Sequence, residues 1–328
     1  MKAITQLGYG SPDILRFDDV EMPVPADTEV LVRVHAASVN ARDWHVLRGD
    51  PFLARLMPGD LGFNGPRVKI LGTDFAGRVE AVGARVTRLR PGDEVYGVAA
   101  GAFAEYVCAT EDAVDRKPVN LTFEQAAAVP LAAITALNGL RDAGRVQPGQ
   151  RVLINGASGG VGLFAVQIAK ALGAEVTGVC SDRNVDLVRS AGADHIIDYT
   201  SEDFTRDSRR YDVVFDLVGN RSLAECRRVL TPAGTLVLSG GGNSRGRVQA
   251  FGPMGLMMRG MALSRFARHR IVVLQVKASV GDLAALRELI EAGAVTPVVD
   301  RTYRLSEAAE AVRYLELEHA RAKVVVTV

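Results

Sequence analysis

The segment from Asn155 to Gly162, which reads NGASGGVG, constrains the fold of this chain more than any other. It follows a short apolar run, and in residues 160–172 apolar side chains then recur at the 3.6-residue spacing of a helix. A glycine-rich turn between a strand and a helix is the context of a dinucleotide-binding fingerprint. The glycines are spaced G-x-x-G-x-x-G rather than G-x-G-x-x-G, because Ser158 takes the middle position. We interpret the segment as a phosphate-binding loop.

The glycines of this loop have distinct physical reasons. Gly156 allows the tight turn, and Gly159 and Gly160 let backbone N–H groups approach a pyrophosphate at the positive end of the helix. Gly162 permits close packing of the helix on the strand. An ordinary glycine-rich turn is the alternative, and the strand–helix pattern on both sides favours cofactor binding. The predicted cofactor-binding residues here are Gly156, Ser158, Gly159, Gly160, Val161 and Gly162.

Apolar strands alternate with helices throughout this half of the chain. The pattern predicts strands at 151–155, 175–180, 195–198, 212–217, 234–238 and 271–276, with helices at 160–172, 183–191 and 221–230. Such alternation implies an α/β domain of the Rossmann type, a doubly wound parallel sheet with helices on both faces. For residues 240–270 we expect a loop followed by a helix, which carries a Met-rich stretch from Met254 to Met261.

The first 120 residues have a different character. Short β-branched runs punctuated by glycine and proline predict strands at 30–35, 74–83, 94–96 and 103–109, with one helix at 40–47. An alanine-rich helix at 123–143, broken at Pro130, marks the change of domain. Helices at 281–292 and 306–318 precede a last strand at 323–328. We therefore predict a mainly β, barrel-like domain from residues 1–121 and 279–328, interrupted by a dinucleotide-binding domain at 122–278.

Charge and cysteine usage exclude several classes of function. Lys and Arg total 39 and Asp and Glu 38, so the chain has no basic field for nucleic acid or an anionic membrane. No signal peptide or membrane span is apparent, which predicts a cytoplasmic protein. The three cysteines lie far apart, and none of the five histidines has metal-ligand spacing. We expect no metal site.

The end of the second predicted strand bears on the choice of cofactor. Ser181 and Arg183 follow this strand, and both suit the 2′-phosphate of NADPH. Asp182 is the opposing observation, because an acid here holds the free ribose of NADH if the strand runs two residues longer. Asp182 also suits the N-cap of the next helix. The sequence favours NADPH over NADH.

Four stretches together resemble the medium-chain dehydrogenase/reductase superfamily, in its zinc-independent quinone oxidoreductase (zeta-crystallin-like) branch. They are residues 37–43, 71–77, 128–137 and 155–162, and their order spans essentially the whole chain. Zinc-dependent relatives carry a cysteine near Asn40 and a Gly-His-Glu run near Gly72-Thr73-Asp74, which this chain lacks. The resemblance implies a GroES-like catalytic domain, no zinc, and NADPH bound between the two domains.

The resemblance also implies roles for individual residues. The implied cofactor contacts are Thr135, Tyr199, Leu217, Val218, Ser239, Gly240 and Gly241. Asn40 and Asp43 match an Asn-x-x-Asp pair beside the nicotinamide and substrate, and a buried helix-start carboxylate is the alternative for Asp43. His45 stands where relatives often carry a tyrosine. Its ordinary pKa, about 6.5, suits proton donation, and simple packing is the alternative.

These observations lead to one functional hypothesis and two alternatives. We expect direct hydride transfer from NADPH to a hydrophobic quinone or α,β-unsaturated carbonyl, with a donor such as Asn40 or water at the substrate oxygen. A cofactor-binding sensor or structural protein without turnover is one alternative. An alcohol dehydrogenase-type enzyme acting on another carbonyl is the second. The strand at 271–276 is a candidate edge for homodimerisation.

Overall fold

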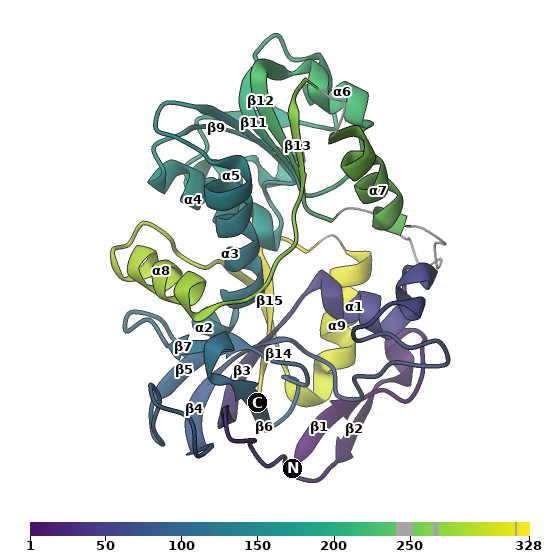
Figure 1. The fold of residues 1–328 in the computed structure, drawn as a ribbon, viewed down its shortest axis with the longest axis vertical. Helices are drawn as coiled ribbons and strands as arrows, with labels where there is room; N and C mark the ends of the chain where they lie inside the picture. The colour runs from purple at the N-terminus through teal and green to yellow at the C-terminus, as the bar shows by residue number, and fades with distance from the viewer. Residues whose placement is uncertain (241–251, 265–267, 319) are drawn as a thin grey trace.

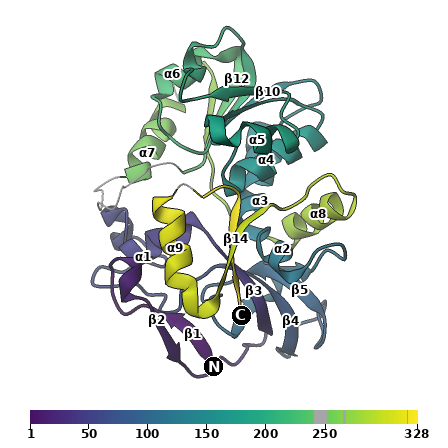
Figure 2. The ribbon, with the colours of Figure 1, turned by 180° about the vertical axis from the view of Figure 1, so that it is seen from behind.

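The protein has two lobes, each built on one large sheet (Figure 1). The computed structural model describes residues 1–240, 252–264, 268–318 and 320–328. Both chain termini lie in the lower lobe, at the end remote from the upper one (Figures 1 and 2). No described helix is long and apolar enough to cross a membrane.

The upper lobe contains a six-stranded sheet in the order β10-β9-β8-β11-β12-β13, with every pair parallel. Its strands are β8 (Arg151–Asn155), β9 (Glu175–Cys180), β10 (His195–Asp198), β11 (Tyr211–Asp216), β12 (Leu230–Leu238) and β13 (Arg270–Val273). This confirms the predicted Rossmann sheet. The direction of winding reverses between β8 and β11, and in such sheets ligands bind at the strand ends beside this switch point.

Side chains of β8 alternate between two apolar cores. Val152 and Ile154 pack with the helices on one face of the sheet, and Leu153 packs with those on the other. The first face carries α3 (Pro130–Leu137), α4 (Gly160–Ala171) and α5 (Val185–Ser190), and the second carries α6 (Leu223–Arg228) and α7 (Gly252–Ser264) (Figure 1). Burial on both faces explains why this strand is almost continuously apolar.

The lower lobe contains a seven-stranded, mostly antiparallel sheet in the order β14-β15-β3-β4-β5-β7, with β6 also paired to β3. Its strands are β3 (Glu29–Val39), β4 (Asp74–Val82), β5 (Glu94–Val98), β6 (Tyr106–Thr110), β7 (Val114–Arg116), β14 (Val299–Arg304) and β15 (Lys323–Thr327). The C-terminal strand β15 therefore joins the N-terminal half of the chain. The domain boundaries at 121 and 278 remain a prediction.

Four further helices pack on the lower lobe. They are α1 (Ala41–Arg48), α2 (Phe123–Ala127), α8 (Val280–Glu291) and α9 (Ala308–Leu317). A forked ion pair between Arg48 and Glu316, at 2.9 Å for both bonds, fastens α1 to α9, which lie side by side (Figure 2). The predicted helix at 123–143 divides at Pro130 as expected and ends in a π-helical turn, Asn138–Gly144.

Four strands, β1, β2, β7 and β14, have no counterpart in the sequence prediction. β1 (Lys2–Thr5) pairs with β2 (Arg16–Asp19), and β14 pairs with β15. Exposed and half-buried residues make up β2 and β14, so neither shows the alternation that marks a strand with one buried face. The predicted strand at 103–109 is displaced and begins at Tyr106.

Candidate functional site

The glycine-rich turn forms a cradle at the switch point. Gly156 adopts a φ of +91°, and a Cβ there would lie 2.8 Å from Cγ2 of Val218. A Cβ on Gly162 would lie 2.1 Å from the carbonyl oxygen of Gly156. Gly159 caps the N-terminus of α4, a helix of 12 residues. Backbone N–H groups at such an end favour an anion, so the cradle fits the pyrophosphate of a dinucleotide.

The carboxylate of Asp216 binds groups at the ends of the strands beside the cradle. Oδ1 of Asp216 accepts hydrogen bonds from Nδ2 of Asn155 at 2.8 Å, from the N–H of Val218 at 3.1 Å and from the N–H of Gly219 at 2.9 Å. The N–H of Ser239 donates to the backbone carbonyl of Asp216 at 3.0 Å. The Asp216 carboxylate therefore organises the loop of Leu217 and Val218, and the backbone carbonyl of the same residue joins this loop to the end of β12.

Asn184 joins the phosphate loop to the end of β9. Its Nδ2 donates to Oγ of Ser158 at 3.1 Å and to Oγ of Ser181 at 3.2 Å. β9 ends at Cys180, so Asp182 lies in a 3-10 turn beyond the strand, where its backbone N–H donates to the Asp198 carboxylate. The longer strand on which the ribose-binding alternative for Asp182 depends is not present.

The structure also describes most of the remaining predicted cofactor contacts. The N–H of Tyr199 donates to the carbonyl of Cys180 at 3.0 Å, and its ring is 53% exposed, so a ligand has access to it. Arg183 is exposed. Thr135 is buried on α3, and its hydroxyl donates to the carbonyl of Leu131 at 2.7 Å. Gly240 has a φ of +76°. Gly241 lies outside the described residues.

On the lower lobe, Asn40 and Asp43 form the start of α1. Oδ2 of Asp43 accepts from the N–H of Asn40 at 2.7 Å, and Oδ1 accepts from the hydroxyl of Thr73 at 3.1 Å. Burial raises the pKa of Asp43 to about 6, although the bond from Asn40 and the charge of Arg42 act in the opposite direction. Asp43 therefore has the geometry of a buried carboxylate at a helix start, which was the alternative in the sequence analysis.

The side chain of Asn40 is fully hydrogen-bonded inside the protein. Its Nδ2 donates to Oδ2 of Asp74 at 3.0 Å and to the carbonyl of Ser38 at 3.3 Å. Its Oδ1 accepts from Nζ of Lys323 at 2.6 Å. Both amide hydrogens are used, so in this arrangement Asn40 does not donate to a substrate oxygen. The expectation that Asn40 stabilises that oxygen stays a prediction, and these internal hydrogen bonds do not favour it.

Asp74 and Lys323 form a buried network with Asn40 that the sequence prediction did not identify. Both are buried, Lys323 at 4% exposure and Asp74 at 0%, and Nζ of Lys323 lies 3.6 Å from Oδ2 of Asp74. Asp74 also accepts from the N–H of Leu131 on α3 at 3.0 Å. A signal existed, because a lysine that opens an apolar strand such as KVVVT is rarely buried without a partner.

His45 has a geometry that limits its use as an acid. Its Nδ1 lies 2.9 Å from the carbonyl of Asp50, which only accepts, so we assign the proton to Nδ1. The ring stacks on Trp44 at 3.8 Å between centroids, and burial lowers its pKa. A neutral ring of this tautomer has an unprotonated Nε2 at neutral pH. Packing, the alternative in the sequence analysis, agrees with this arrangement.

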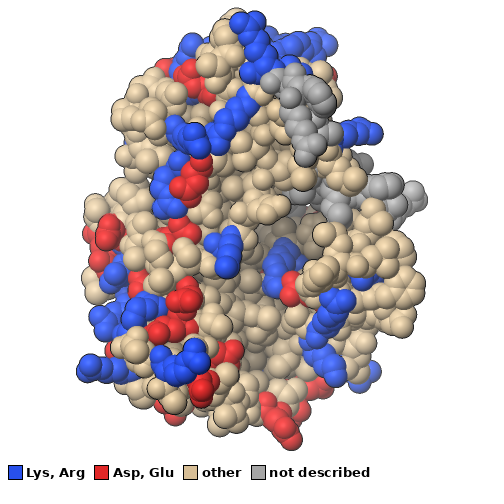
Figure 3. Space-filling view, viewed as in Figure 1, with Lys and Arg blue, Asp and Glu red and all other residues tan. Residues whose placement is uncertain are grey.

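The surface is hollowed between the two lobes, with basic side chains beside the hollow (Figure 3). The guanidinium of Arg42 donates to the hydroxyl of Thr73 and to the carboxylate of Asp60, both at 2.5 Å.

Among the residues that the structure describes, no group of three or more His, Cys, Asp or Glu side chains is placed to hold a metal ion.

Comparisons with known proteins agree with this architecture. Residues 26–119 match the family model of the alcohol dehydrogenase GroES-like domain, and residues 191–326 match that of zinc-binding dehydrogenases. Quinone oxidoreductase of Sus scrofa is 31% identical, and the match covers 98% of this chain and 95% of that protein. The 2-methylene-furan-3-one reductase of Solanum lycopersicum is 34% identical over 99% of this chain and 79% of its own length.

Solved structures give the same result. The quinone oxidoreductase from Coxiella burnetii superposes with a TM-score of 0.87 at 32% identity, covering 100% of this chain and 99% of that one. The Escherichia coli quinone oxidoreductase in complex with NADPH has a TM-score of 0.82 at 26% identity, with 100% of both chains covered. The fold and the site thus define a two-domain oxidoreductase. The chain belongs to the medium-chain dehydrogenase/reductase superfamily, in its quinone oxidoreductase branch.

Proposed function

We propose that the protein is an NADPH-dependent reductase that transfers hydride directly to a hydrophobic quinone or α,β-unsaturated carbonyl, without zinc. The observation that carries this proposal is the bonding of Asn40 and Thr73. These residues stand near the positions of the zinc ligands in zinc-dependent relatives, and their polar atoms are already hydrogen-bonded to Asp74 and Asp43. An amide and a hydroxyl engaged in this way do not form the thiolate and imidazole donor set of catalytic zinc.

The residues at the switch point fit a dinucleotide. The cradle of Gly156 and Gly162 leaves no room for a Cβ, and it opens onto the N-terminus of α4. Ser181, Arg183 and Tyr199 supply a hydroxyl, a cation and an exposed ring at the end of β9, which suits a 2′-phosphate. The NADPH complex of the Escherichia coli relative supports this choice. When bound, the cofactor supplies the hydride.

The chemistry of the acceptor follows from what the protein offers. A conjugated acceptor delocalises the arriving negative charge onto its oxygen, and therefore needs less Lewis acid assistance than a simple ketone. The names of the Sus scrofa and Solanum lycopersicum relatives point to quinones and to an enone. We assign the proton that completes the reduction to water, because Asn40 is fully bonded and neutral His45 has no proton on Nε2. The protein's own contribution is then positioning and exclusion of bulk water.

The test is turnover by protein treated with a chelator. We expect NADPH oxidation, followed at 340 nm, with 9,10-phenanthrenequinone and with small enones, and equal rates before and after chelation. NADPH binding by fluorescence titration, without oxidation of any acceptor, would instead favour the sensor or structural alternative. A rate that disappears on chelation and returns with zinc would support the alcohol dehydrogenase alternative. Homodimerisation through β13 and a cytoplasmic location remain predictions.

A further inference from the structure

Lys323, the first residue of β15, has an ammonium group enclosed by protein. Its Nζ donates to Oδ1 of Asn40 at 2.6 Å and to the carbonyl of Val39 at 3.3 Å, and lies 3.6 Å from Oδ2 of Asp74. Two of the three ammonium protons are used in these hydrogen bonds, and the Asp74 carboxylate supplies the nearby opposite charge. Isolated burial of such a charge is costly, which makes the pairing with Asp74 a requirement for keeping Lys323 at this position.

The bond to Asn40 fixes the orientation of that amide. Since an ammonium only donates, Oδ1 of Asn40 must face Lys323, and Nδ2 must face Asp74. The backbone N–H of Asn40 is held by Asp43, three residues along at the start of α1. Every polar side-chain atom of Asn40 is therefore fixed, and with it the beginning of α1 in the lower lobe.

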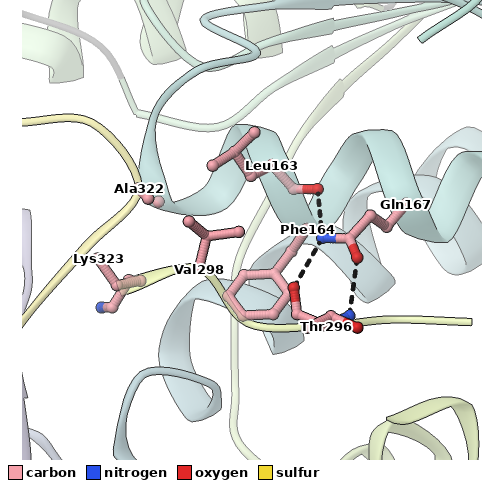
Figure 4. Close-up of a pocket in the computed structure, with 8 residues that line it drawn as sticks. Leu163, Phe164, Gln167, Thr296, Val298, Ala322 and Lys323 are labelled. Carbon is pink, nitrogen blue, oxygen red and sulfur yellow. Dashed lines mark hydrogen bonds between the residues drawn. The ribbon is translucent and has the colours of Figure 1, made fainter. Parts of the chain in front are cut away.

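Lys323 and its neighbour Ala322 also contact the phosphate loop of the upper lobe. The N–H of Ala322 donates to the carbonyl of Ser158 in the phosphate loop at 3.0 Å. A Cβ on Gly160 would lie 2.9 Å from Cδ of Lys323, so the methylene chain of the lysine passes directly along this loop. Figure 4 shows Lys323 beside Ala322 at the start of β15, with its ammonium directed away from the ring of Phe164. The short segment of Ala322 and Lys323 thus contacts both Asn40, at the start of α1, and the phosphate loop.

We propose that Lys323 is a positioning residue for hydride transfer, which holds Asn40 and the start of α1 at a fixed separation from the phosphate loop. This inference rests on the proposed function. Hydride transfer needs donor and acceptor carbons in near contact, and small displacements by groups outside the reacting atoms lower its rate strongly. We assign Lys323 no direct contact with the cofactor, because its buried ammonium faces Asn40, Val39 and Asp74 within the protein. Its loss therefore acts on kcat more than on cofactor affinity.

The test compares Lys323→Met with Arg321→Ala, a matched change to an exposed basic residue in the same segment. For Lys323→Met we expect kcat to fall at least about tenfold, while Kd for NADPH changes less than about threefold. The deuterium isotope effect with 4-deuterated NADPH should rise as hydride transfer becomes slower. In the protein without cofactor, amide exchange of a peptide covering 40–48 should accelerate at least about fivefold. Arg321→Ala should match the wild type throughout.

Each other outcome overturns the inference. Folded Lys323→Met with wild-type kcat, isotope effect and exchange would reduce Lys323 to a packing residue. A rise in Kd as large as the fall in kcat would make it a cofactor ligand. If Lys323→Met does not fold, the charge-neutral double variant Lys323→Met/Asp74→Asn decides by the same measurements, because it leaves no orphaned buried charge. An inactive wild type would instead overturn the proposed function, and this inference with it.

Discussion

The amide Nδ2 of Asn155 donates to Oδ1 of Asp216 at 2.8 Å, and these are the last residues of β8 and β11, paired in register across the switch point of the sheet. The same oxygen accepts the N–H groups of Val218 and Gly219. Among the described residues, Oδ2 of Asp216 is buried with no hydrogen-bond partner. One carboxylate thus shapes the loop that follows β11.

Replacement of Asp216 by alanine should weaken cofactor binding. It removes the acceptor of one buried donor, on Asn155, and of the two half-buried N–H groups of Val218 and Gly219, at up to about 1–3 kcal/mol for each donor left without a partner. It also frees the loop of Leu217 and Val218. We expect Kd for NADPH to rise about tenfold, measured by fluorescence titration. Asp212→Ala, at the other end of β11, is the control, because its carboxylate accepts from Arg151 and Thr231 away from the cradle. Equal affinities for Asp216→Ala and the wild type would contradict this assignment.

Arg183→Ala should reduce the preference for NADPH over NADH. A charge-assisted bond to phosphate contributes about 1.5–3 kcal/mol, so kcat/KM with NADPH should fall about ten- to hundred-fold and that with NADH should stay constant. Arg189→Ala, an exposed arginine on α5, should leave both values unchanged. An unaltered NADPH/NADH ratio in Arg183→Ala would remove this residue from the phosphate site.

The contribution of the Asp43 carboxyl to stability should fall as the pH rises from about 4 to about 6. The pKa of Asp43 is raised to about 6 by burial, against about 3.9 in an unfolded chain. In this interval the native state binds more protons than the unfolded state, so the contribution of Asp43 is fully present below pH ~4 and lost above pH ~6. The buried carboxyl of Asp74, whose pKa burial also raises, adds a slope of the same sign.

The measurement is the free energy of unfolding in urea at pH 4, 5, 6 and 7. We expect Asp43→Asn to remove about 1–3 kcal/mol of this pH dependence. Asp112→Asn, on an exposed turn, should keep the wild-type slope. A slope that is identical in Asp43→Asn and the wild type would show that the Asp43 carboxyl titrates normally in the folded protein.

Local sequence patterns predicted the sheet of the upper lobe and the phosphate loop, because both depend on neighbours in the chain. The alternation of short apolar runs with helical patterns located β8 to β12, and the glycines of the cradle are close together in sequence. The pairing of Lys323 with Asn40 was not predictable in this way, since 283 residues separate them and only the return of β15 to β3 brings them together. Similarly, no local sequence pattern indicates that the side-chain amide of Asn40 donates hydrogen bonds to both Asp74 and Ser38.

The central claim is that hydride moves directly from NADPH to a conjugated acceptor held between the two lobes. The most direct test is single-turnover reduction of a small enone with NADPH deuterated at C4, by protein treated with a chelator, and mass and NMR analysis of the product. The account predicts one deuterium at the β-carbon of the reduced ketone, transferred from one face of the nicotinamide only. A product without deuterium, or NADPH that binds and is never oxidised by any quinone or enone, would contradict it.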